Sequence, residues 1–153
     1  MADTNLIKEL FFEDLYIGQK FISTKHTITE DEIINFANSY DPQVFHTNPQ
    51  LAKDTFFKGL AASGWHTASI SMRLMVLSFK VKGGLIGAGC DINWPIPTRP
   101  NDVLQVETEI IGCRESKSKP DRGLITIKGL TYNQNHEIVQ ILTSKIVVLK
   151  TNA

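Results

Sequence analysis

The chain has 153 residues, of which 42% are hydrophobic and 21% are charged, enough for one domain with its own core and too few for two. Lys plus Arg and Asp plus Glu number 16 each. This balance gives no electrostatic reason to expect nucleic acid or an anionic membrane surface as a partner. We therefore expect a single domain over residues 1–153, with residues 1–10 as a loosely held lead-in.

The cysteines and the apolar segments bear on the cellular setting. Cys90 and Cys113 lack the CxxC spacing and are too few for a disulfide framework, which favours a reduced, cytoplasmic protein. The first ten residues show no basic stretch followed by an apolar run, so no secretory signal is expected. The most apolar segment, residues 60–81, carries Arg73 and Lys80, which favours a buried helix over a membrane span.

The first half of the chain predicts one strand and one helix. Residues 11–28 alternate in polarity after Gly18, which indicates a strand. Thr29 and Glu32 have the spacing of a capping box and predict a helix start. The apolar face of this helix follows the spacing i, i+3, i+4, i+7 through Ile33, Phe36, Ala37 and Tyr40, so Tyr40 is expected in the core.

A loop and a second helix follow. Pro42 ends the first helix, and residues 41–57 read as an ordered loop with a short helical turn, anchored on the core by Phe56 and Phe57. The segment from Leu60 to residue 81 is apolar on nearly all sides, which predicts a helix with Ser63 as its N-cap that is surrounded by the rest of the protein.

The second half of the chain is β-like. Strands are expected over residues 85–94, 103–111, 124–132 and 138–149, separated by proline-rich or polar turns. One buried helix beside about five strands predicts an α+β fold, in which an antiparallel sheet wraps around the long apolar helix.

Three segments carry a family resemblance: residues 39–46, residues 59–69 and residues 94–102. The stretch from Ser39 to His46, Ser-Tyr-Asp-Pro-Gln-Val-Phe-His, resembles the loop motif of the MaoC-like acyl dehydratases, the R-specific enoyl-CoA hydratase group of the hotdog fold. Asp41 and His46 keep the five-residue spacing of that motif, and Gly64 matches the glycine at the family's helix entry. In place of the motif's Asn, Pro and Gly the chain has Gln43, Val44 and Ser39, and Ser63 replaces the histidine before the glycine.

The resemblance implies a hotdog-fold hydratase or dehydratase acting on a 2-enoyl or 3-hydroxyacyl thioester, with acyl-CoA as the expected substrate. Asp41 and His46 would act on water, and the Gly64 amide at a helix N-terminus would hold the thioester oxygen. No cofactor is expected, since coenzyme A enters only as part of the substrate. The resemblance also implies at least a homodimer.

Other residues are candidates for substrate binding. Four flank the trio in the chain and the fifth is a basic residue that could meet coenzyme A phosphates: Gln43, Phe45, Ser63, Trp65 and Arg99. From the residues alone, Asp41 before a proline is an ordinary turn residue and Gly64 an ordinary packing glycine. The four histidines lack the HExxH spacing, so no metal site is expected. Two further functions stay open: a hotdog thioesterase, which releases free coenzyme A, and a non-catalytic acyl-thioester-binding subunit.

Overall fold

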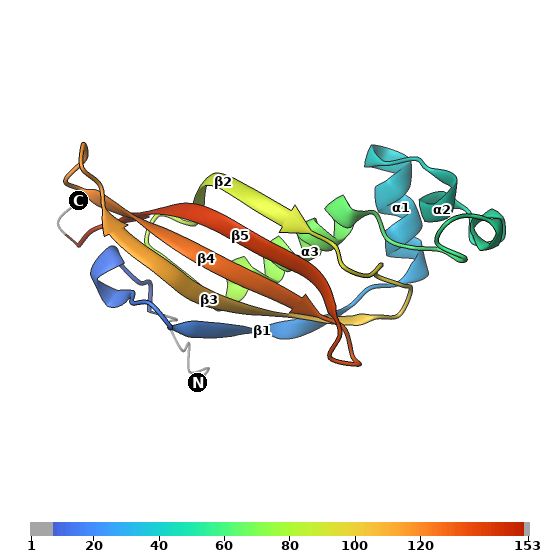
Figure 1. Cartoon of the computed structure of the whole chain (residues 1–153), viewed down its shortest axis with the longest axis horizontal. Coiled ribbons are helices and arrows are strands. Elements are labelled where there is room, and N and C mark those ends of the chain that lie inside the picture. Colours follow the sequence, from blue (N-terminus) through green and yellow to red (C-terminus); the bar gives the residue numbers. More distant parts are fainter. Residues whose placement is uncertain (1–7, 152–153) are drawn as a thin grey trace, which may run out of the picture.

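A five-stranded antiparallel sheet with one long helix against it forms the body of the protein (Figure 1). The computed structural model describes residues 8–151. The strands are β1 (Lys20–Thr27), β2 (Ile86–Asn93), β3 (Val103–Glu115), β4 (Arg122–Tyr132) and β5 (Ile138–Leu149), in the spatial order β1-β3-β4-β5-β2. The helices are α1 (Glu30–Tyr40), α2 (Val44–Thr47) and α3 (Gly64–Ser78), with single 3₁₀ turns at Phe12–Asp14 and Leu51–Asp54.

The core lies between α3 and one face of the sheet. Along β4, buried and half-buried side chains alternate, as expected for a strand with one covered face. Met75 of α3 and Phe79, the C-cap of this helix, pack against Ile110, Ile125 and Ile146 from three different strands. The predicted α+β sheet of five antiparallel strands is confirmed.

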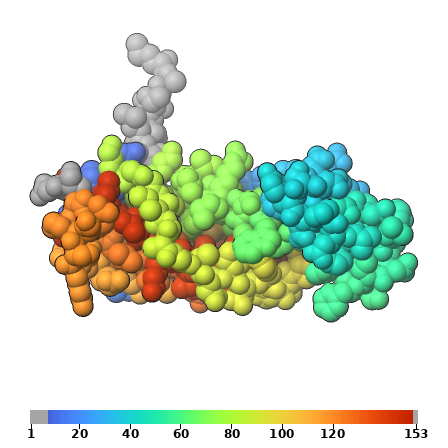
Figure 2. Space-filling model, turned by 90° about the horizontal axis from the view of Figure 1, so that it is seen from above, coloured from blue at the N-terminus to red at the C-terminus, as the bar shows by residue number. Residues whose placement is uncertain are grey.

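Helix α1 and the loop after it lie together at one end of the molecule, beyond the ends of the strands (Figures 1 and 2). The predicted capping box is present: the Thr29 hydroxyl accepts from the Glu32 amide, and the Glu32 carboxylate accepts from the Thr29 amide. Two core predictions in this region are wrong. Tyr40 is 77% exposed because the last turn of α1 projects beyond the core, and Phe56 is 89% exposed on the loop.

Helix α3 is shorter and less enclosed than predicted. It begins at Gly64 and packs on the sheet through one side. The prediction of a helix surrounded on all sides is wrong for this chain alone, because its other side exposes Trp65, Met72 and Val76. These three residues recur at i, i+7 and i+11, so they form one apolar stripe.

The beginning of the described chain is held in place. Leu10 forms a parallel bridge with Val81, and its backbone N–H and C=O pair with Lys80 and Lys82. The predicted loose lead-in is therefore wrong for Leu10, and residues 1–7 lie outside the described residues. Within residues 8–151, no helix combines the length and hydrophobicity needed to cross a membrane.

Candidate active site

The end of α1 and the short helix α2 bring Asp41 and His46 together. Asp41 is the C-cap of α1, and Pro42 prevents the helix from continuing. His46 lies in the single turn of α2, three residues after its N-cap Gln43. Asp41 Oδ2 and His46 Nε2 are 3.3 Å apart, so the predicted acid and imidazole are direct neighbours.

Two side chains hold the Asp41 carboxylate. The Gln43 amide donates to Oδ1 at 2.6 Å, and the Ser63 hydroxyl donates to Oδ2 at 2.7 Å. Ser63 is completely buried and stands at the N-cap of α3, as predicted, but its hydroxyl makes no capping bond to the helix. Both oxygens of the carboxylate are therefore fixed by neutral donors.

These contacts keep Asp41 ionised. Burial on its own would raise the pKa of the carboxyl group. The hydrogen bonds from Gln43 and Ser63, together with the charge of His46, outweigh burial and hold the Asp41 pKa below its usual range. About a fifth of the Asp41 side chain remains exposed, so the carboxylate keeps access to solvent or to a ligand.

A backbone carbonyl sets the tautomer of His46. Nδ1 lies 2.6 Å from the carbonyl oxygen of Ala61, which can only accept, so Nδ1 carries a proton and donates it. The Ala61 amide in turn donates to the carbonyl oxygen of Phe45, next to His46 in the chain. The second nitrogen, Nε2, is consequently the one that is free to gain and lose a proton beside Asp41.

His46 and Gly64 line the same cavity, of about 420 Å³, which we call the reaction cavity. Gly64 is the first residue of α3, so its amide has no partner within the helix. Asp41 is not among the lining residues and contacts the cavity through His46. The remaining walls are mostly apolar: Phe56, Phe57, Ala62, Thr67, Trp94, Pro95, Ile96, Pro97 and Thr98.

Trp94 lies directly on Gly64. A Cβ atom at position 64 would come within 2.7 Å of the indole ring, so only glycine fits beneath it. We did not predict Trp94 as a site residue, nor the walls Phe57 and Thr67. The available signal was the Trp94-Pro95 pair at the end of β2, where an aromatic residue is followed by a proline that cannot continue a strand.

The five predicted substrate-binding residues have other contacts in the structure. Gln43 and Ser63 bind Asp41, as described above. Phe45 packs edge-on against His46 and beside Phe57, outside the lining of the reaction cavity. Trp65 is 61% exposed and also lies outside this lining.

Arg99 fastens the loop that leads into α3. Its guanidinium group donates to the carbonyl oxygens of Phe57, Gly59 and Leu60 at 2.6–3.2 Å. All three of these hydrogen bonds go to backbone oxygens. They hold the side chain partly buried against the loop, so it does not extend into solvent. From the sequence, Arg99 was a candidate for a coenzyme A phosphate contact, with an exposed solvated charge as the favoured alternative; the structure gives it a loop-positioning contact.

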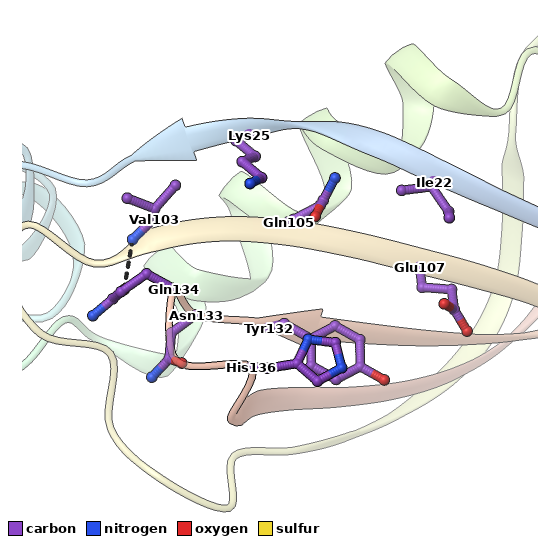
Figure 3. Close-up of a pocket in the computed structure, with 9 residues that line it drawn as sticks. All are labelled: Ile22, Lys25, Val103, Gln105, Glu107, Tyr132, Asn133, Gln134 and His136. Atoms are coloured by element: carbon purple, nitrogen blue, oxygen red, sulfur yellow. Dashed lines mark hydrogen bonds between the residues drawn. The ribbon is translucent and has the colours of Figure 1, made fainter.

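A second hollow of similar size, about 390 Å³, lies on the face of the sheet opposite α3 (Figure 3). It contains none of the predicted site residues, and the rings of Tyr132 and His136 stack in it with their centroids 4.4 Å apart. Among the described residues, no group of three or more His, Cys, Asp or Glu side chains is arranged to hold a metal ion.

Comparison with known proteins places the chain in a family. The model of the MaoC like domain matches residues 14–129. The crystal structure of a MaoC-like dehydratase from Rhodospirillum rubrum is 48% identical, with a TM-score of 0.90 over 92% of this chain and 97% of that one. The protein YdeM of Bacillus subtilis, described as uncharacterized, is 29% identical over 90% of this chain and 96% of its own length.

A more distant structure agrees in fold. The unliganded R-hydratase PhaJ1 from Pseudomonas aeruginosa is 22% identical, with a TM-score of 0.74 over 93% of this chain and 87% of that one, a likeness that concerns the fold alone. Because the domain model covers most of the sequence and the fold and the predicted motif agree with it, the chain belongs to the MaoC-like family of hydratases and dehydratases, with the hotdog fold.

Proposed function

We propose that the protein is a hydro-lyase that adds water to a 2-enoyl thioester, or removes it from the 3-hydroxyacyl thioester, with acyl-CoA as the substrate. The observation that carries the proposal is the 3.3 Å contact between Asp41 Oδ2 and His46 Nε2, with His46 and Gly64 in the wall of one cavity. Hydration requires a base for water, an acid for C2 and a donor for the charge that develops on the thioester oxygen.

Asp41 is the base in this proposal. Its lowered pKa means that the carboxylate is ionised at neutral pH and is ready to accept a proton from water. The bonds from Gln43 and Ser63 fix its orientation, so the water that it binds is held in one place. As the proton passes to Asp41, the water oxygen forms its bond to C3.

His46 is the acid. With Nδ1 committed to the Ala61 carbonyl, Nε2 is the ring atom that delivers a proton to C2. After the step Asp41 is protonated and His46 is neutral. A proton transfer across the direct contact between Oδ2 and Nε2 then restores the starting state, so one turnover consumes one water and no other reagent.

In this proposal the Gly64 amide N–H stabilises the negative charge that develops on the thioester oxygen. In hydration, the C2–C3 double bond shifts electrons towards the thioester oxygen before C2 is protonated. A backbone N–H at the first residue of α3 points out of the helix and is favourably placed for an oxyanion. Loss of one such donor typically costs about 3 kcal/mol of transition-state stabilisation.

The active form is a homodimer in this proposal. Its support is the exposed stripe of Trp65, Met72 and Val76 on α3 and the unpaired outer edge of β2, which ends the sheet. An apolar stripe and an open strand edge on the same molecule are features that a second copy would cover.

The direct test measures hydration of crotonyl-CoA by the parent protein and by the variants Asp41→Asn and His46→Gln. The reaction is monitored through the loss of the enoyl thioester absorbance. Each variant should lose on the order of 10²- to 10⁴-fold in kcat/KM. Asp54→Asn, an exposed acid in the same loop, is the matched control and should keep the parent rate.

Product analysis separates the alternatives. Formation of 3-hydroxybutyryl-CoA supports the hydro-lyase. Release of free coenzyme A without hydration would instead identify a thioesterase, and binding of crotonyl-CoA without turnover a non-catalytic subunit. If Asp41→Asn and His46→Gln fold normally and hydrate crotonyl-CoA at the parent rate, the assignment of the pair is wrong.

A further inference from the structure

Two hollows lie along α3, and a hydrogen bond between Trp94 and Gln140 joins a wall residue of one to a wall residue of the other. The first is the reaction cavity. The second, of about 320 Å³, lies between α3 and strands β2 and β5, and we call it the α3 groove. Its walls are largely apolar and include Ala68, Met72, Leu85, Ile92, Leu142 and Ile146.

Trp94 lines the reaction cavity, and its hydrogen-bond partner Gln140 lines the α3 groove. The indole Nε1 donates to Gln140 Oε1 at 2.9 Å. Gln140 is only 1% exposed and Trp94 is 39% exposed, so the bond joins a partly exposed indole to a buried amide, and breaking it takes a donor from the Gln140 oxygen. The bond therefore runs from one hollow to the other, with the indole at the boundary.

Packing also fixes the indole. One face of the ring lies against the α-carbon of Gly64, where no side chain would fit. Trp65 meets it edge-on, with ring centroids 5.4 Å apart and planes at 81°. Trp94 is 39% exposed at the end of a strand, and it is held there by a partly buried hydrogen bond and by contacts on two sides.

We propose that Trp94, held by Gln140, is a specificity-determining residue that confines the acyl group to the reaction cavity, so that the protein selects short acyl thioesters. The inference rests on the proposed function, because it takes an acyl thioester as the occupant of the cavity. In this proposal a longer acyl tail enters the α3 groove, the apolar hollow whose wall residue Gln140 is bonded to Trp94. To do so it must displace the indole and leave Gln140 unpaired.

The size of the effect follows from the groove's chemistry. Each methylene group moved from water into an apolar groove contributes roughly fourfold to affinity. With the indole in place, the tail of a long substrate gains none of this affinity and must fold back towards solvent. With the indole removed, four extra methylenes should shift the preference strongly towards the long substrate.

The first experiment compares kcat/KM for 2-butenoyl-CoA and 2-octenoyl-CoA in the parent, in Trp94→Leu and in Trp94→Phe. The parent should favour the four-carbon substrate by at least about tenfold, and Trp94→Leu should shift the ratio towards eight carbons by at least about tenfold. Trp94→Phe keeps a ring on Gly64 and loses the bond to Gln140, so it should give an intermediate ratio and serves if Trp94→Leu does not fold. The double variant Trp94→Leu/Ala68→Phe, which refills the groove, should restore the short-chain preference.

The second experiment measures binding of butyryl-CoA and octanoyl-CoA, which are saturated and cannot be hydrated. If no variant hydrates any enoyl-CoA, the proposed function fails, while the chain-length dependence of these dissociation constants still decides the role of Trp94. The parent should bind butyryl-CoA more tightly and Trp94→Leu should bind octanoyl-CoA more tightly. Equal chain-length ratios in the parent and Trp94→Leu, a parent that prefers the long chain, or binding of neither ligand would overturn the inference.

Discussion

The Ser63 hydroxyl donates its hydrogen bond to Asp41 Oδ2, 22 residues earlier in the chain, and not to the helix that Ser63 begins. A serine at an N-cap usually accepts from an amide of the first helical turn. Here the N-terminal amides of α3 are left to other partners, and the carboxylate gains a donor inside a buried site. The start of α3 and the Asp41 carboxylate are thus joined directly by a hydrogen bond.

Ser63→Ala tests this link. Removing the hydroxyl deletes one of the donors that lower the Asp41 pKa, so the pKa rises. The acid limb of the pH profile of kcat/KM should move to higher pH, and kcat/KM at neutral pH should fall by roughly tenfold, because a hydrogen bond to a charged group is lost. Ser69→Ala, which removes an exposed hydroxyl from the same helix, should leave the profile unchanged. An unmoved acid limb in Ser63→Ala would contradict the role given to this bond.

Gly64→Ala should destabilise the fold as well as the site. The added Cβ would come within 2.7 Å of the Trp94 ring, so either the indole or the start of α3 must move. Overpacking of this kind typically costs about 1–3 kcal/mol in the free energy of unfolding. Gly87→Ala is the matched control, since a Cβ there meets no atom within 4 Å. Urea unfolding of both variants measures the difference. Equal midpoints would show that the indole can shift with no loss in the free energy of unfolding.

Arg99 should matter for stability more than for coenzyme A affinity. Its guanidinium group binds the carbonyl oxygens of Phe57, Gly59 and Leu60, so Arg99→Ala leaves three partly buried acceptors short of a donor. We expect a loss of about 2 kcal/mol or more in the free energy of unfolding. Arg99→Lys should recover little of it, because an ammonium group cannot reproduce the planar fork.

The control for Arg99 is Arg73→Ala, which removes an exposed guanidinium group from α3. It should leave the unfolding midpoint in place. A normal midpoint for Arg99→Ala, combined with a higher KM for the coenzyme A thioester, would instead favour the phosphate contact that the sequence suggested.

His66 should make the protein less stable in mild acid. Its ring is buried, stacks on Phe36 with centroids 4.5 Å apart, and leaves Nδ1 without a partner in the described chain. Burial lowers the pKa of His66; the nearby Glu32 opposes this shift and His26 adds to it. The unfolded chain therefore takes up a proton at a higher pH than the folded protein, and stability falls as the pH drops below about 6.5.

The measurement is the melting temperature between roughly pH 7.5 and pH 5.5, the range in which the unfolded histidine titrates. His66→Phe keeps an aromatic ring against Phe36 and removes the titrating group, so its melting temperature should fall less than that of the parent. His136→Asn changes an exposed turn residue at a positive φ that asparagine tolerates, and it should keep the parent's dependence. If His66→Phe falls as steeply as the parent, another group causes the acid sensitivity.

The exposed stripe of α3 should hold two chains together. Met72→Glu places a charge in the middle of this stripe, and we expect it to convert a dimer into a monomer, as measured by light scattering after gel filtration. Lys80→Glu, an exposed change just beyond the same helix, should leave the mass unchanged. A parent protein that is monomeric at micromolar concentration would contradict the proposed dimer.

Local signals in the sequence predicted most of the fold. The capping box at Thr29 and the limits of β5 appear as expected, because capping and strand alternation depend on neighbours in the chain. The error over α3 has a different cause. Hydrophobicity shows that a surface avoids water and does not show whether the chain's own sheet or a second molecule covers it.

The family resemblance, together with the five-residue spacing, predicted that Asp41 and His46 lie together, and the structure places them 3.3 Å apart. The sequence did not predict the other contacts of this region. The bonds of Ser63 and Arg99 join segments 22 to 42 residues apart, and nothing in the local sequence indicates these partners. Trp94 was missed for the same reason: its pairing with Gln140 spans 46 residues and depends on the strand order.

The strand order also determines when the site comes into existence during synthesis. Within residues 8–151, β2 pairs only with β5, the last strand, and Gln140 of β5 binds Trp94 at the end of β2. When residues 1–130 have emerged from the ribosome, Asp41, His46 and Gly64 are therefore present. The strand that holds the cavity wall, β5, is still missing. Such distant pairings form late and slowly. The nascent chain should stay inactive, with an unpaired strand in need of protection, until its last segment emerges.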